Sequence, residues 1–187
     1  MEENKPTLLK SAMNVGAITG AILIIYSLIT YFVGLTGSTA VGYFALVVLG
    51  FCIFYFTKTY RDKQLHGFIS YGQALTFGVL IGVFASVILA FFLYLELKFI
   101  DPTLIEKQLD LMREKMLQKG MPDDQVEKAI EMSKKFATPV MSALMSILSY
   151  AFFSFLISLI TSAFVKKEGT PFDSTSNRTY IIDNIEN

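Results

Sequence analysis

Three long runs without a single Asp, Glu, Lys, Arg or His dominate this sequence. They extend from Ser11 to Thr57, from Gly67 to Leu95 and from Phe136 to Val165. Because a helix needs about 20 residues to cross the ~30 Å core of a bilayer, the first run is long enough for two passes and each of the others for one. The chain is 53% hydrophobic and 17% charged, whereas soluble proteins have roughly 45–50% apolar and about 25% charged residues. The pattern predicts a membrane protein.

The turn inside the first run is marked by Gly34, Gly37 and Gly42, which lie among Ser and Thr residues between two apolar stretches. We therefore expect an all-α integral membrane protein with four transmembrane helices in residues 1–167. The spans are predicted near residues 12–33, 41–56, 71–95 and 139–165. Residues 168–187 are polar and are predicted to form a poorly ordered cytoplasmic tail.

Basic residues near the span ends predict the orientation in the membrane, because cytoplasmic loops carry an excess of Lys and Arg. Lys5 and Lys10 precede the first span, three basic residues follow the second, and Lys166 and Lys167 follow the fourth. The segment 96–135 carries eight basic residues and argues for the opposite orientation, but long loops count less and the first pair of spans usually dominates. The sequence predicts that both termini are cytoplasmic and that segment 96–135 lies outside.

Small residues recur every fourth position in three of the predicted spans. Residues four apart share one helix face, and small residues let helix backbones approach closely in a membrane, where burying Leu against Leu gains little. We expect these positions to form the helix-packing seam: Ala12, Gly16, Gly20, Ala74, Gly78, Gly82, Ser86, Ala90, Ser146, Ser154 and Ser158. The alternative is that the serines line a polar track for a substrate.

The segment between the third and fourth spans carries most of the charge and predicts an extramembrane helical hairpin over residues 101–135. Asp101 and Pro102 suggest the N-cap and first residue of one helix, Gly120 suggests its end, and Pro122 opens a second helix. An apolar stripe on the first helix consists of Ile105, Leu109, Met112 and Met116. This stripe is either a surface for a partner protein or part of a hairpin that covers itself or lies on lipid headgroups.

Catalytic and metal-binding patterns are missing from the sequence. The predicted spans contain no charged residue at bilayer depth, with Glu96 and Lys98 placed at an outer edge, which disfavours an ion path or proton relay. One His and one Cys give neither a metal cluster nor a catalytic dyad with a second member. The 16 basic and 16 acidic residues balance, so no net charge attracts nucleic acid. The sequence predicts no enzyme activity, no cofactor, no metal site and no nucleic-acid partner.

The stretch Gly67-Phe68-Ile69-Ser70-Tyr71-Gly72-Gln73-Ala74-Leu75, followed by Gly78, resembles a bacterial membrane family known only as domain of unknown function 4199. The resemblance extends to Ile100-Asp101-Pro102 and the charged segment after it. It implies a four-helix protein of the bacterial inner membrane. It implies no activity and transfers no catalytic residue.

Two roles are consistent with these features. The first is an accessory or scaffold subunit of a membrane complex, in contact with lipids and with a membrane-associated enzyme or a second copy of itself. The alternative is an oligomeric facilitator for a neutral or lipidic substrate, with the serines along its path. An intramembrane enzyme would need a nucleophile and base that the sequence does not offer.

Overall fold

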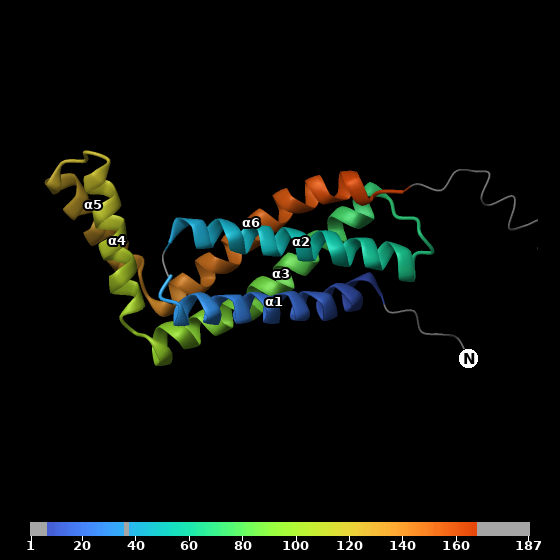
Figure 1. Ribbon diagram of the computed structural model, residues 1–187, viewed down its shortest axis with the longest axis horizontal. Coiled ribbons are helices and arrows are strands. Elements are labelled where there is room, and N and C mark those ends of the chain that lie inside the picture. Colours follow the sequence, from blue (N-terminus) through green and yellow to red (C-terminus); the bar gives the residue numbers. More distant parts are fainter. Residues whose placement is uncertain (1–6, 36–37, 168–187) are drawn as a thin grey trace, which may run out of the picture.

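The computed structural model describes residues 7–35 and 38–167, and within these ranges the chain is helical throughout apart from short connections (Figure 1). The four long helices are α1 (Leu8–Phe32), α2 (Thr39–Gln64), α3 (Tyr71–Leu95) and α6 (Pro139–Val165). Between α3 and α6 the chain forms a π-helix, η1 (Glu96–Ile100), and two shorter helices, α4 (Leu104–Gln118) and α5 (Asp123–Phe136). The predicted tail, residues 168–187, lies outside the described residues.

Each of the four long helices is long and apolar enough to cross a membrane, which confirms the predicted all-α fold with four candidate spans. Helix α2 extends beyond the span predicted near residues 41–56 and continues as a helix to Gln64. The charged residues after Thr57 mark where the helix leaves the apolar region, and charge alone does not end a helix. The chain turns only at His66 and Gly67, which both adopt positive φ angles of 53° and 87°.

Helix α3 begins at a capping box that uses two residues of the stretch around Tyr71. The Ser70 hydroxyl accepts a hydrogen bond from the Gln73 backbone N–H at 3.3 Å, and the Gln73 side-chain oxygen accepts one from the Ser70 N–H at 3.3 Å. Helix α6 begins in a related way, with Thr138 accepting a bond from the Met141 N–H at 3.2 Å and Pro139 at the first position. Both starts are therefore encoded locally.

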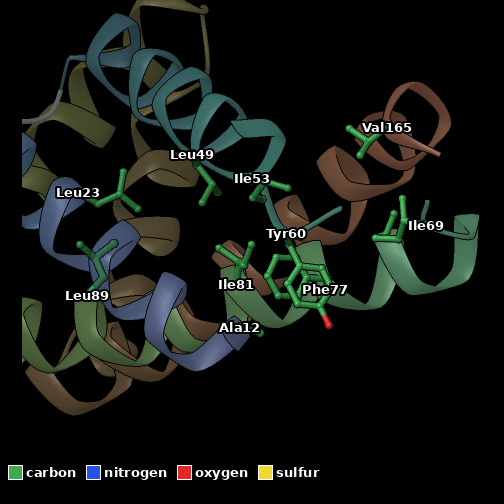
Figure 2. Close-up of a cluster of buried hydrophobic side chains, with 11 residues drawn as sticks. Ala12, Leu23, Leu49, Ile53, Tyr60, Ile69, Phe77, Ile81, Leu89 and Val165 are labelled. Atoms are coloured by element: carbon green, nitrogen blue, oxygen red, sulfur yellow. The ribbon is translucent and has the colours of Figure 1, made fainter. Parts of the chain in front are cut away.

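Helix α3 is the centre of the four-helix body. It packs most extensively against α6 and α1, while α2 lies mainly against α6 (Figure 1). Figure 2 shows the buried apolar side chains that fill the space between these helices. Near one end the Tyr60 ring of α2 stacks on the Phe77 ring of α3, with centroids 4.0 Å apart and planes 17° from parallel.

The same end of the body is tied together by backbone and side-chain hydrogen bonds. Ile69, just before α3, and Lys167, just after α6, exchange two backbone hydrogen bonds of 2.9 and 3.0 Å as an isolated antiparallel bridge. The Arg61 guanidinium donates to the Val165 carbonyl at 3.0 Å. The Ser11 hydroxyl donates to the Gln64 side-chain oxygen at 2.9 Å. These bonds bring the start of α1, the end of α2 and the end of α6 to one end.

Helices α4 and α5 lie beside each other at the opposite end of the body (Figure 1). The Arg113 guanidinium of α4 pairs with the Glu127 carboxylate of α5 at 3.0 Å. The Ser133 hydroxyl donates to the Met112 sulfur at 3.8 Å, and Val126 is buried. We refer to these two helices as the α4–α5 pair.

Asp101 does not occupy the N-cap position expected from the sequence, since the N-cap of α4 is Thr103. The Asp101 carboxylate accepts hydrogen bonds from the Thr103 N–H at 3.0 Å and from the Lys107 ammonium at 2.8 Å. Asp101 also donates its own N–H to the Glu96 carbonyl to close the π-helix, at 2.8 Å. Asp101 therefore stabilises the turn between η1 and α4 from a position two residues before the N-cap, Thr103.

Candidate functional site

The α3–α6 interface contains four of the small residues predicted for the packing seam. A Cβ placed on Gly78 would lie 2.5 Å from the Ser158 Oγ and 3.1 Å from the Ile53 Cγ2. A Cβ placed on Gly82 would overlap the Ser154 side chain. The two helices are therefore as close here as glycine allows, and the two serines fill the space that the glycines leave.

The α1–α3 interface is built in the same way on the other side of α3. A Cβ on Gly16 would lie 2.6 Å from the Phe84 Cβ and 3.0 Å from the Ile81 carbonyl oxygen, and one on Gly20 would lie 3.1 Å from the Ile88 Cβ. The other predicted seam residues of α1 and α3 are buried as well: Ala12, Ala74, Ser86 and Ala90.

The serines of α6 divide into two groups. Ser154 and Ser158 are fully buried, and neither hydroxyl has a hydrogen-bond partner within the described part of the chain. Ser146 is half-buried and donates to the Ala143 carbonyl of its own helix at 2.7 Å. Ser146 lines a cavity, whereas Ser154 and Ser158 pack against α3.

This cavity of about 300 Å³ lies among α1, α2, α3, η1 and α6, toward the end that carries the α4–α5 pair. We call it the Glu96 cavity. Part of its wall is apolar and includes Leu23, Val41, Ala45, Leu89, Phe92 and Leu93. The polar side chains on its wall are Tyr26, Ser27, Thr30, Ser38, Glu96, Ser146 and Tyr150.

Several hydroxyl groups of the Glu96 cavity donate their hydrogen to the protein backbone. Tyr26 donates to the Val41 carbonyl at 2.8 Å, and Thr30 donates to the Ser27 carbonyl at 2.9 Å. Ser146 donates to its own helix, as described above. Since a hydroxyl oxygen still has lone pairs after its hydrogen is used, these groups remain available chiefly as acceptors.

Glu96 is the charged residue on the wall of this cavity. It is only 5% exposed, and no side chain in residues 7–35 and 38–167 donates a hydrogen bond to its carboxylate. The sequence places Glu96 at the outer edge of the third span, but the structure buries it at the start of η1. The sequence contains a signal for this burial. Glu96 lies on the same helix face as Leu89, Phe92 and Leu93, at spacings of three and four residues.

A second, shallower groove adjoins the Glu96 cavity between α2 and α6. It is lined by Gly42, Tyr43, Leu46, Ser149, Tyr150 and Phe153. Gly42 and Tyr150 also belong to the wall of the Glu96 cavity, so the two spaces adjoin at these residues. The side chains of Tyr43 and Phe153 are exposed at the surface that would face lipid.

The predicted stripe of α4 is half-buried along its length: Ile105, Leu109, Met112 and Met116. Met112 and Met116 line a groove on α4, together with Leu111 and three polar residues. Met112 also contacts Ser133 of α5, so part of the stripe is covered within the α4–α5 pair. The pair still exposes Leu117, Met132 and Phe136.

Charged groups of the described segments form no cluster of three or more residues suited to a metal ion. Outside the spans, Asp101 and Lys107 shift each other's titration. The hydrogen bond from Lys107, helped by Thr103, lowers the pKa of Asp101, and the same bond raises the pKa of Lys107. This ion pair joins the segment before α4 to the first turn of α4.

No curated protein and no solved structure is significantly similar to the chain. A family match does exist, and it runs from within α1 to just past the end of α6, so it includes all the seam residues except Ala12, the Glu96 cavity and the α4–α5 pair. Over residues 14–167 the chain matches the family described as "Protein of unknown function (DUF4199)", and it therefore belongs to that family.

Proposed function

We propose that this protein is a non-enzymatic accessory or scaffold subunit of a complex in the bacterial inner membrane. The observation that carries the proposal is the position of the α4–α5 pair. The two helices pack on each other at one end of the four-helix body and make little contact with it (Figure 1). An extramembrane helical hairpin that its own protein does not cover is suited to holding a partner.

The partner that fits best is a membrane-associated enzyme. The pair presents exposed apolar side chains at Leu117, Met132 and Phe136 among charged residues. Methionine side chains adapt to irregular partner surfaces. Phe136 ends α5 just before α6 begins, so the apolar surface continues toward the membrane, where an anchored partner would be found.

The distribution of basic residues supports a cytoplasmic position for both termini. Hydrogen bonds bring the start of α1 and the ends of α2 and α6 together, and six basic residues lie at or next to those termini: Lys10, Lys58, Arg61, Lys63, Lys166 and Lys167. By the excess of Lys and Arg in cytoplasmic loops, this end faces the cytoplasm. The α4–α5 pair then lies outside.

Site-specific photocrosslinking tests the partner role. A photoreactive residue at Met132 of the full-length protein should give a crosslink to one membrane-associated enzyme, and Met132→Asp should weaken co-purification of that enzyme in mild detergent. The same label at Ile25, which is exposed on α1, serves as the control. A protein that crosslinks only to lipid at Met132 and purifies without any enzyme would contradict the proposal.

Cysteine labelling tests the orientation separately. In a Cys52→Ala background, Lys119→Cys should react with an impermeant maleimide in intact spheroplasts. Lys63→Cys should react only after permeabilisation. The reverse pattern would place the α4–α5 pair in the cytoplasm.

An oligomeric facilitator for a neutral or lipidic substrate is the second candidate, and the Glu96 cavity with its adjoining groove favours it. Ser154 and Ser158 pack into the α3–α6 interface, so they contribute less to this role than Ser146 does. Replacing Ser146 with Ala should slow substrate passage in proteoliposomes if the protein is a facilitator. An unchanged rate would argue against this role.

A further inference from the structure

We propose that the Glu96 cavity binds the primary ammonium group of an aminophospholipid whose acyl chain lies in the groove between α2 and α6. The inference goes beyond the accessory role, since it concerns a ligand of the four-helix body. It rests on three observations: a largely buried glutamate whose carboxylate has no hydrogen-bond partner in residues 7–35 and 38–167, a wall with several acceptor oxygens, and an apolar groove that adjoins the cavity.

The carboxylate of Glu96 determines the charge of the ligand. The residue is 95% buried and lines the cavity, and no cation in the described segments reaches its carboxylate. The nearby lysines are engaged elsewhere: Lys98 donates to the Tyr94 hydroxyl at 2.9 Å, and Lys107 pairs with Asp101 at 2.8 Å. Because burying an unpaired charge is costly, a cation in the cavity would be strongly favoured.

The hydroxyl groups determine the ligand's hydrogen-bonding character. Tyr26, Thr30 and Ser146 donate to backbone carbonyls, so their oxygens face a ligand with lone pairs. A primary ammonium group has three N–H donors and no acceptor. Its three donors match in number one carboxylate and two hydroxyl oxygens of the cavity wall. A quaternary ammonium group carries the same charge but has no N–H to donate.

The groove determines the source of the ammonium group. It shares Gly42 and Tyr150 with the cavity wall and is lined mainly by apolar and aromatic side chains, among them Leu46 and Phe153. Helices α2 and α6 are candidate membrane spans, so the exposed side of this groove would face lipid. A headgroup in the cavity and an acyl chain in the groove match this arrangement. The cavity volume of about 300 Å³ lies at the lower end of the roughly 300–1,000 Å³ range of small-molecule sites.

Native mass spectrometry of the full-length protein in mild detergent can test this. The protein is mixed with phosphatidylethanolamine and its mono-, di- and trimethylated forms, all with the same acyl chains. We expect retention to fall with each added methyl group. Phosphatidylethanolamine should be retained at least about tenfold better than phosphatidylcholine, as expected for charge-assisted hydrogen bonds. Equal retention of all four lipids would overturn the proposal.

Two pairs of variants locate the site. Glu96→Gln keeps the shape of the side chain and should reduce phosphatidylethanolamine retention to the level of phosphatidylcholine. Glu106→Gln makes the same change at an exposed residue of α4 and should have no effect. Ala45→Leu should also abolish the preference by filling the cavity, whereas Ala21→Leu on the exposed face of α1 should not. Should Glu96→Gln fail to fold, the Ala45→Leu comparison decides, and an unchanged preference there overturns the proposal.

A competition arm distinguishes a lipid from a soluble amine. Ethylammonium carries the same N–H donors without the acyl chains. If millimolar ethylammonium fails to displace phosphatidylethanolamine, the lipid assignment is supported. Displacement at that concentration would show that the cavity takes a soluble amine, and the lipid assignment would be overturned. Neither result depends on whether a partner enzyme binds the α4–α5 pair.

Discussion

Ser154 of α6 lies directly against Gly82 of α3, in the space that any side chain at residue 82 would occupy. In a membrane, lipid tails are as apolar as leucine, so helices gain most from close packing and little from excluding lipid. The contact between these two residues therefore marks the position where the association of α3 with α6 is most sensitive to size.

Gly82→Ala is expected to destabilise the protein by about 1–3 kcal/mol, because the added methyl group forces α3 and α6 apart. Gly72→Ala is the matched change in the same helix, where a Cβ has open space. It should be neutral or slightly stabilising, since alanine favours helix over glycine. Detergent-induced unfolding followed by circular dichroism measures both. Equal stability of the two variants would contradict the close packing.

Gly16→Ala should weaken the α1–α3 interface for the same reason, because its Cβ would meet the Phe84 Cβ at 2.6 Å and a backbone oxygen at 3.0 Å. Gly50→Ala is the control, since its nearest neighbour would be the Ile157 Cγ2 at an ordinary 3.6 Å. The midpoint of thermal unfolding should fall for the first variant only. A lower midpoint for Gly50→Ala alone would show that α2 and α6 are closer than α1 and α3.

Phe77→Ala should be strongly destabilising, by about 3–5 kcal/mol, because it leaves a cavity under the Tyr60 ring. Phe77 is fully buried, whereas Phe91 of the same helix is 65% exposed on the surface. Phe91→Ala should therefore cost much less. The same unfolding assay measures both variants. A similar loss of unfolding free energy in the two would show that Phe77 is not a core residue.

Asp101 should titrate below the ordinary aspartate pKa of about 3.9, because Lys107 and Thr103 stabilise its charged form. Lys107→Met should raise the pKa of Asp101 toward the ordinary value, and Lys128→Met on α5 should not. Carboxyl carbon NMR of the protein in micelles reports this pKa directly. An unchanged value in Lys107→Met would show that the ion pair is absent in solution.

The direction of these shifts sets the pH range in which the pair stabilises the fold. The depressed pKa of Asp101 means that its contribution is complete above the unfolded value and is lost as pH falls through the folded value. The raised pKa of Lys107 means that its contribution is complete below about 10.4 and is lost as pH rises beyond the folded value. Between these limits the connection to α4 should be insensitive to pH.

The sequence predicted the fold class because the absence of charge over long runs is a direct consequence of the membrane as solvent. It also predicted which residues share a face, because the helical period fixes that. It could not predict which faces meet. Ser146 and Ser154 have the spacing of a single ladder, yet one lines a cavity and the other packs on Gly82. Helical spacing gives direction, whereas the distance to a neighbouring helix depends on the whole bundle.

Glu96 illustrates the same difference for the candidate site. Its position at the end of an uncharged run indicated an edge, and an edge is usually wet. The π-helix that begins at Glu96 and the side chains of α1, α2 and α6 around it determine that this residue is largely buried. The helical spacing from Leu89 to Glu96 indicated which face of the helix Glu96 lies on. It gave no information on which distant helices cover that face.

The bridge between Ile69 and Lys167 has a mechanical consequence. Because two backbone hydrogen bonds join Ile69, two residues before α3, to Lys167, two residues after α6, the bridge holds the start of α3 and the end of α6 together. The bridge lies at the end of the body opposite the α4–α5 pair. A separation of the helices near Glu96 would therefore leave these two hydrogen bonds in place.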